Sequence, residues 1–179
     1  MQFDMDFFRG HPIIETAGRK ALVDTGCPGI IGQEASFVFL GRTYPMVSEY
    51  HGATVAQLTE LVGTRIDVLL GGAALVDNEF RLDWNAGVSE FSSEPLIAGG
   101  TRVPVDLMAN CPVIEVSVGG ETVRAFLDTG ATVSYLPDRL VRQYPAAGEF
   151  LDFFPGHGPF RTNLADAPVT IGGRTVTAR

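Results

Sequence analysis

The sequence has two cysteines, one lysine and no long apolar run, and each shortage excludes a class of protein. Two cysteines in 179 residues exclude a disulfide-dense secreted scaffold and a four-cysteine zinc site. A single lysine and a net charge of −8 make a poor partner for nucleic acid phosphates. No apolar run reaches the roughly 18–20 residues of a membrane helix, and the acidic N-terminus lacks a signal-peptide pattern. We therefore expect a cytoplasmic protein that binds neither membranes nor nucleic acid.

Glycine and proline are plentiful, and they predict many turns between short strands. The chain holds 21 glycines and 11 prolines, and 45% of its residues are hydrophobic, which is enough for a packed core. Helical spacing over 53–62, stopped by Gly63, predicts one short helix, and 137–143 predicts one or two further turns. We therefore expect an all-β protein with one or two short helices. Strands are predicted over 12–16, 20–23, 36–47, 66–70, 80–84, 113–118, 122–127 and 169–176.

Two blocks of the sequence resemble each other at an offset of about 100 residues. Pro-Ile-Ile-Glu at 12–15 leads to Ala-Leu-Val-Asp-Thr-Gly at 21–26, and Pro-Val-Ile-Glu at 112–115 leads to Ala-Phe-Leu-Asp-Thr-Gly at 125–130. A third pair, 38–43 and 169–175, follows in the same order. This spacing is too long for a solenoid unit and indicates a duplication. We predict two lobes, residues 1–95 and 96–179, with 85–111 as their connection.

Both copies end in Asp-Thr-Gly directly after an apolar run. One such triplet alone is usually a turn that ends a strand, but its repetition inside a duplicated block favours a paired-carboxylate site. Two carboxylates held close together cannot both ionise, so Asp24 and Asp128 would share a proton. The ionised group could then activate a water molecule while the protonated group polarises a carbonyl. That chemistry requires no metal and no cofactor.

This combination resembles the retropepsin-like aspartic peptidases. Their signature is an apolar run, Asp-Thr/Ser-Gly, a hairpin flap and an apolar-apolar-Gly motif, which the first half matches at 22–26, near Gly41, and at Leu69, Leu70 and Gly71. The resemblance implies a two-lobed acid-protease-like barrel fold in which Leu69-Leu70-Gly71 closes the first lobe beside the catalytic loop. It implies that Asp24 and Asp128 are the catalytic pair. It also implies support of that pair by Thr25, Gly26, Thr129 and Gly130.

Three features depart from that pattern. The first triplet is followed by Cys27-Pro28-Gly29 instead of a small residue and a hydroxyl residue, which predicts weaker support for Asp24. No second apolar-apolar-Gly motif follows the second triplet, so we expect an incomplete second lobe in which the strands at 113–118 and 169–176 have an open edge or a gap. The flap aromatic is undecided between Tyr44 and Tyr50.

Other residues have weaker functional interpretations. The three histidines, at 11, 51 and 157, are too scattered for a metal motif and are expected in turns or at the surface. Cys27 is expected to be an inert buried thiol, because the neighbouring Asp24 would raise its pKa. Residues 144–163 form an insertion with four phenylalanines, which either pack the lobe or overhang the cleft.

The resemblance predicts an aspartic endopeptidase that hydrolyses a peptide or protein substrate. One alternative is a peptide-binding module of the same fold that is catalytically silent, because its second lobe is incomplete. Another is a protease whose site is completed by a homodimer of first lobes. Inhibition by pepstatin would distinguish an active peptidase from a binding module, and sedimentation would detect the homodimer.

Overall fold

The computed structural model describes residues 1–97, 99–154 and 157–179. Strands dominate, so the predicted all-β class is confirmed. The described residues form three helices instead of one or two: α1 (Val55–Val62), α2 (Gly72–Leu75) and α3 (Asp138–Val141). The sheets of the described residues stay open, so the barrel of the prediction is not formed. Within these residues, no helix has the length and apolar character needed to cross a membrane.

The N-terminal half, residues 1–95, builds one seven-stranded sheet in the order β4-β7-β3-β2-β1-β9-β8. At its centre β3 lies between β2, antiparallel, and β7, parallel. The other described strands of this half, β5 and β6, form a separate hairpin. The strands are β1 (Gln2–Phe8), β2 (His11–Thr16), β3 (Arg19–Val23), β4 (Ile30–Gly32), β5 (Ser36–Phe39), β6 (Arg42–Pro45), β7 (Val68–Leu70), β8 (Glu79–Asp83) and β9 (Val88–Ser92).

Apolar side chains cover both faces of this sheet. Val23 and Leu70 point into one cluster, which the β5–β6 hairpin covers with Phe37 and Phe39. Leu22 points into the opposite cluster, where α1 packs. Helix α1 matches its prediction: Thr54 and Gln57 form a capping box, and Gly63 ends the helix in the left-handed conformation. Strand β3 is therefore buried on both faces and paired at both edges.

The predicted connection between the halves, 85–111, is wrong at both ends. Val88–Ser92 is strand β9, which pairs with both β1 and β8 and places Phe91 in the core. Asp106–Met108 is strand β10, which pairs with β11. The alternation of Val88, Glu90 and neighbouring residues is too short to outweigh the surrounding turn residues, and the strand is stabilised by pairing with β8 on one side and with the distant β1 on the other.

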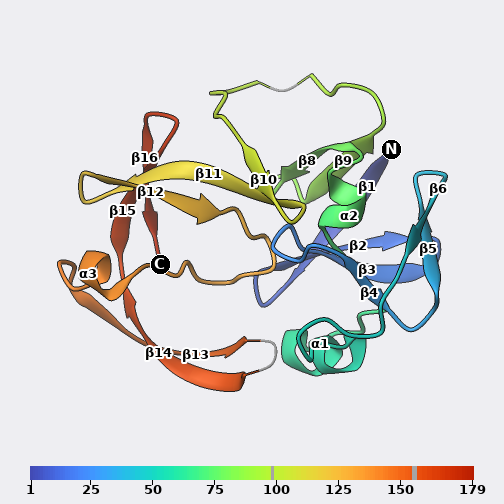
Figure 1. The fold of residues 1–179 in the computed structure, drawn as a ribbon, viewed down its shortest axis with the longest axis horizontal. Coiled ribbons are helices and arrows are strands. Elements are labelled where there is room, and N and C mark those ends of the chain that lie inside the picture. Colours follow the sequence, from blue (N-terminus) through green and yellow to red (C-terminus); the bar gives the residue numbers. More distant parts are fainter. Residues whose placement is uncertain (98, 155–156) are drawn as a thin grey trace.

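The C-terminal half, residues 96–179, builds a five-stranded sheet around β11. Strand β11 pairs with β12 along its length, with β10 at its start and with β15 at its end, so the open edge expected at 113–118 is not found. At 169–176, the only open edge in the described residues is that of β16, which pairs with β15 alone. One cluster, including Ile114, Val116 and Leu140, fills a face of this sheet. No strand pair joins the two large sheets in the described residues (Figure 1). The strands are β10 (Asp106–Met108), β11 (Cys111–Val118), β12 (Glu121–Phe126), β15 (Ala167–Ile171) and β16 (Arg174–Ala178).

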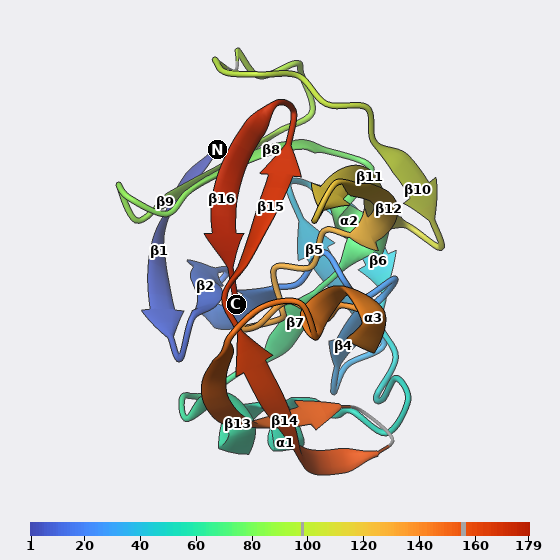
Figure 2. The same cartoon turned by 90° about the vertical axis from the view of Figure 1, so that its left-hand side faces the viewer.

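Most of the predicted insertion, 144–163, is a long hairpin of β13 (Ala146–Phe154) and β14 (Gly158–Ala165). Residues 155 and 156 of that insertion lie outside the described residues. The hairpin forms its own two-stranded sheet. Figures 1 and 2 both place it at the end of the molecule where α1 lies. The β13–β14 hairpin is therefore not part of either large sheet.

The duplication seen in the sequence is also present in the backbone. Ile13 lies opposite Leu22 in the β2–β3 pair, and Val113 lies opposite Phe126 in the β11–β12 pair. The turns before β2 and β11 also correspond, because each has two successive positive φ angles (50° and 88° at 9–10, 50° and 64° at 109–110). Both Asp-Thr-Gly triplets therefore leave equivalent hairpins in equivalent register.

Candidate active site

The two triplets meet between the halves, and their threonines are hydrogen-bonded to each other's loops. The Thr25 N–H donates to Thr129 Oγ1 at 3.1 Å, and the Thr129 N–H donates to Thr25 Oγ1 at 3.0 Å. The Thr25 hydroxyl donates to the Leu127 carbonyl, and the Thr129 hydroxyl donates to the Val23 carbonyl at 2.8 Å. Four reciprocal hydrogen bonds thus hold the loops together, and Thr25 is only 2% exposed.

Backbone N–H groups hold each carboxylate in place. Asp24 Oδ1 accepts from the Gly26 N–H at 2.8 Å and from the Cys27 N–H at 3.1 Å. Asp128 Oδ1 accepts from the Gly130 N–H at 2.8 Å. Asp24 is half-buried and Asp128 is exposed. Contrary to the expectation from Pro28, Asp24 has more support, because the Cys27 N–H supplies the additional bond.

Each triplet glycine gives space to the carboxylate of the other triplet. A Cβ atom on Gly26 would lie 2.3 Å from Asp128 Cγ, and a Cβ atom on Gly130 would lie 2.5 Å from Asp24 Cγ. Such contacts are far inside van der Waals distance, so only glycine fits at these two positions. The same geometry shows that each carboxyl group lies directly over the opposite loop.

The two carboxyl groups form an interacting pair. Burial raises the pKa of Asp24 to about 7, and the charge of Asp128 and a hydrogen bond to its side chain act in the same direction. The N–H groups of Gly26 and Cys27 oppose this shift. Asp24 therefore holds a proton at slightly acid pH, next to a second carboxyl group.

The motif Leu69-Leu70-Gly71 lies beside the first triplet. The Asp24 N–H donates to the Leu70 carbonyl at 3.1 Å, and the Gly72 N–H donates to the Cys27 carbonyl at 2.7 Å. A Cβ atom on Gly71 would lie 2.0 Å from the Gly29 carbonyl oxygen, so this position also requires glycine. The motif thus anchors the backbone on both sides of Asp24.

Two residues at the site, His11 and Cys111, were not assigned to it by the sequence analysis. The Cys111 thiol donates to the Gly26 carbonyl at 3.3 Å, and His11 faces the backbone of Gly130. Burial lowers the pKa of His11, while Gly130 and the charges of Asp152 and Asp128 oppose this shift. Both residues directly precede the matched prolines, Pro12 and Pro112, so their equivalence was present in the repeat. The different residue types concealed it.

Neither Tyr44 nor Tyr50, the two candidates for a flap aromatic, lies on a hairpin that projects from the core. Tyr44, on β6, is 5% exposed and its hydroxyl accepts from Asn78, so it belongs to the core. Tyr50 is 40% exposed and packs against His51. The β5–β6 hairpin near Gly41 is present as predicted, but its phenylalanines fill the first core.

The β13–β14 hairpin contacts the segment that follows the second triplet. The Tyr135 hydroxyl donates to Asp152 on β13, and the Tyr135 ring lies 6.1 Å from that of Phe160 on β14. The charge of Asp152 acts on His11, which the Asp128 charge also reaches. The two interpretations of 144–163, packing of the lobe and a loop over the cleft, both stay predictions.

Cys27 is a buried free thiol directly after the first triplet. Burial raises the pKa of Cys27 to about 12, and Asp24, Cys111 and Asp128 add to the shift, so its thiol stays protonated. Across the described parts of the chain, no group of three or more His, Cys, Asp or Glu side chains is placed to hold a metal ion.

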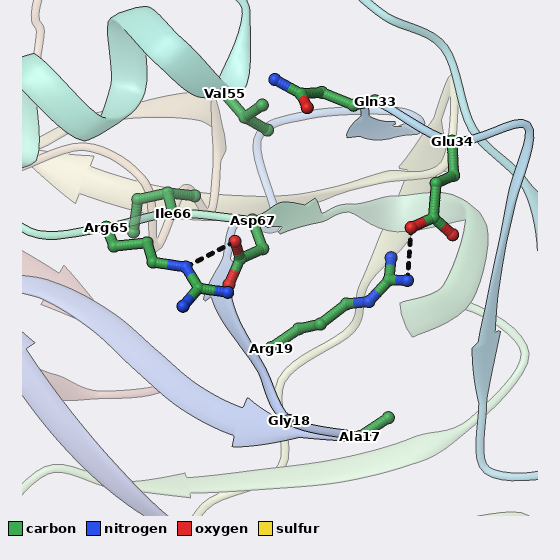
Figure 3. Close-up of a pocket in the computed structure, with 9 residues that line it drawn as sticks. All are labelled: Ala17, Gly18, Arg19, Gln33, Glu34, Val55, Arg65, Ile66 and Asp67. Atoms are coloured by element: carbon green, nitrogen blue, oxygen red, sulfur yellow. Dashed lines mark hydrogen bonds and ion pairs between the residues drawn. The ribbon is translucent and has the colours of Figure 1, made fainter.

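A surface pocket of about 370 Å³ lies elsewhere, on the N-terminal half (Figure 3). Its charged side chains already pair with one another, Arg19 with Glu34 and Arg65 with Asp67. Because these pairs use the charges of the pocket internally, it offers no free catalytic or binding group comparable to the dyad.

Comparisons with protein-family models, curated proteins and solved structures found no match to this chain.

Proposed function

We propose that the chain is an aspartic endopeptidase of the retropepsin-like kind, with Asp24 and Asp128 as its catalytic pair. The observation that carries the proposal is the reciprocal hydrogen bonding of the two triplets through Thr25 and Thr129. Turns that merely end strands have no need to meet. Here two such turns, 104 residues apart, meet with a carboxyl group over each opposite glycine.

The mechanism follows from the unequal environments of the two carboxyl groups. Asp24, with its raised pKa, holds the shared proton, and Asp128 accepts a proton from a water molecule as that water attacks the scissile carbonyl. The Asp24 proton passes to the carbonyl oxygen, which gives a neutral tetrahedral diol. The diol collapses when one hydroxyl returns its proton to Asp24 and Asp128 gives its proton to the leaving nitrogen. Both triplets come from one chain, so the proposal does not need a second copy.

The test is hydrolysis of a quenched fluorescent peptide library at pH 4–7, with and without pepstatin. We expect cleavage that pepstatin inhibits and that a metal chelator does not affect. Cleavage that persists in Asp24→Asn would show that another group or a contaminant is responsible. A library that is bound but not cut would contradict the enzymatic proposal.

A catalytically silent peptide-binding module stays the second candidate, because the pair is asymmetric. Asp128 is exposed and accepts one backbone N–H, whereas Asp24 is half-buried and accepts two. An exposed carboxylate is less constrained in position, and catalysis depends strongly on such positioning. Saturable binding of pepstatin without turnover of any library peptide would support this candidate.

A further inference from the structure

The outer edge of β12 is open, unlike that of its counterpart β3. Strand β3 is paired with β2 on one side and with β7 on the other. In the described residues, β12 pairs with β11 alone. The Leu127 N–H points toward β11, where it donates to the Pro112 carbonyl. The alternation of a strand therefore directs the N–H groups of Arg124, Phe126 and Asp128 to the free side.

The same edge carries large exposed apolar side chains. Phe126 is 55% exposed and Leu127 is 47% exposed, whereas their counterparts Leu22 and Val23 are 2% and 0% exposed. An unpaired strand edge with apolar side chains is a template for another strand. In the N-terminal half, β7 covers the equivalent edge: it pairs with β3, and Leu69 packs in the cluster that also holds Leu22.

We propose that the free edge of β12 binds an extended polypeptide segment that runs parallel to it. The sequence of this segment is three apolar residues followed by glycine. The register follows from β3 and β7, where Ala21, Leu22 and Val23 lie opposite Val68, Leu69 and Leu70. The three apolar residues of the segment then lie opposite Ala125, Phe126 and Leu127. This docking surface is independent of whether the dyad hydrolyses peptides.

The fourth residue of the docked segment is predicted to be glycine for a steric reason. In the N-terminal half, Gly71 follows the third apolar residue and passes within contact of the Cys27 and Gly29 carbonyls. The equivalent loop positions in the C-terminal half are Ala131 and Val133. A docked segment in the same register would bring its fourth residue against these two backbone positions, where a side chain would collide.

Docking would also change the surroundings of Asp128. The Asp24 N–H is bonded to the Leu70 carbonyl, the last residue of β7. The Asp128 N–H would find the equivalent carbonyl on the docked segment. A docked segment would thus shield the exposed Asp128 and give its backbone the anchor that Asp24 already has.

To test this, the segment of this chain that contains β7 and Gly71 is copied and tethered to the C-terminus of the protein. A copy of residues 64–78, joined after Arg179 by a flexible Gly/Ser linker, raises the effective concentration to the millimolar range. We expect amide exchange at Arg124, Phe126 and Asp128 to slow at least tenfold relative to the untethered chain. The matched control carries the same fifteen residues in scrambled order and should leave these three rates unchanged.

Two variants locate the docking site. Phe126→Lys in the tethered chain should abolish the protection, because a charge replaces the apolar contact. Leu151→Lys removes an equally exposed apolar residue on β13 and should leave the protection intact. Exchange rates equal in the tethered and scrambled chains would overturn the proposal. So would protection of β12 in the untethered chain that grows with its concentration, because the occupant would then be a second copy.

Discussion

Asp24 and Asp128 are each the first residue of an Asp-Thr-Gly triplet, and the two triplets meet between the halves. The surroundings of the two residues nevertheless differ greatly. The strand before Asp24 is buried on both faces and paired on both edges. The strand before Asp128 exposes Phe126 and Leu127 and is paired on one edge. The four threonine hydrogen bonds are nevertheless reciprocal. The geometry of the paired loops therefore depends on the triplets and their hairpins more than on a fully enclosed sheet.

The largest expected effect tests whether the two aspartates are functionally equal despite this difference. If the proposed function is correct, Asp24→Asn and Asp128→Asn should each reduce kcat/KM by about 1,000-fold or more, because neither proton transfer survives alone. Peptide hydrolysis by each purified variant measures this. Asp138→Asn, which makes the same change at an exposed carboxylate on α3, is the matched control and should retain most activity. Activity within tenfold of wild type in either aspartate variant would exclude the dyad.

The second effect measures the difference in burial between the two strands. Leu22→Ala should cost about 3 kcal/mol of unfolding free energy, because it opens a cavity between the sheet and α1. Phe126→Ala should cost less than about 1 kcal/mol, because more than half of that side chain is already in water. Urea unfolding of both variants gives the comparison. Equal losses would mean that Phe126 is covered in solution.

The third effect concerns pH. The pKa of Asp24 is raised to about 7 in the folded protein from 3.8 in the unfolded chain. The folded state therefore binds more protons between these values, and stability falls as pH rises through that window. The loss amounts to at most about 4 kcal/mol. Asp24→Asn should remove most of this slope in urea titrations from pH 4 to 8. A variant with the wild-type slope would show that another group causes it.

The fourth effect concerns the threonines that join the halves. Thr25→Val should cost about 2 kcal/mol, because it leaves the Thr129 N–H and the Leu127 carbonyl without partners in a buried place. Thr129→Val should cost less, because Thr129 is half-buried and water can reach its partners. Thr122→Val, on the exposed face of β12, is the control and should change stability by less than about 0.5 kcal/mol. Thermal unfolding at one pH ranks the three variants.

The sequence predicted the parts of this structure that depend on local signals. The helix at 55–62 carries its own caps, and the hairpins turn at glycines, so their positions follow from neighbouring residues. The two triplets were found because the duplication repeats them. Strand β9 was missed because its own alternation is short and because one of its two partners, β1, lies more than 80 residues earlier in the chain. His11 and Cys111 were missed because equivalent places hold chemically different side chains.

The asymmetry of support at the dyad could not be predicted either. Pro28 suggested that Asp24 would be the weaker member, since proline offers no N–H. The folded loop instead directs the Cys27 N–H to Asp24 and anchors the Asp24 backbone on Leu70. Both contacts depend on a tight turn and on a strand more than 40 residues away, and neither is visible in the tripeptide itself.

The threonine bonds also have a mechanical consequence. The two large sheets share no strand pair in the residues that the structure describes, while Thr25 and Thr129 bond across the boundary. Such a joint acts as a pivot, because atoms on a rotation axis move least when the bodies around it rock. The joint lies in the same two tripeptides that carry Asp24 and Asp128, and the N–H groups of these tripeptides also hold the two carboxylates. A change that loosens the joint should therefore disturb the carboxyl pair as well, so the attachment of the halves and the geometry of the pair cannot vary independently.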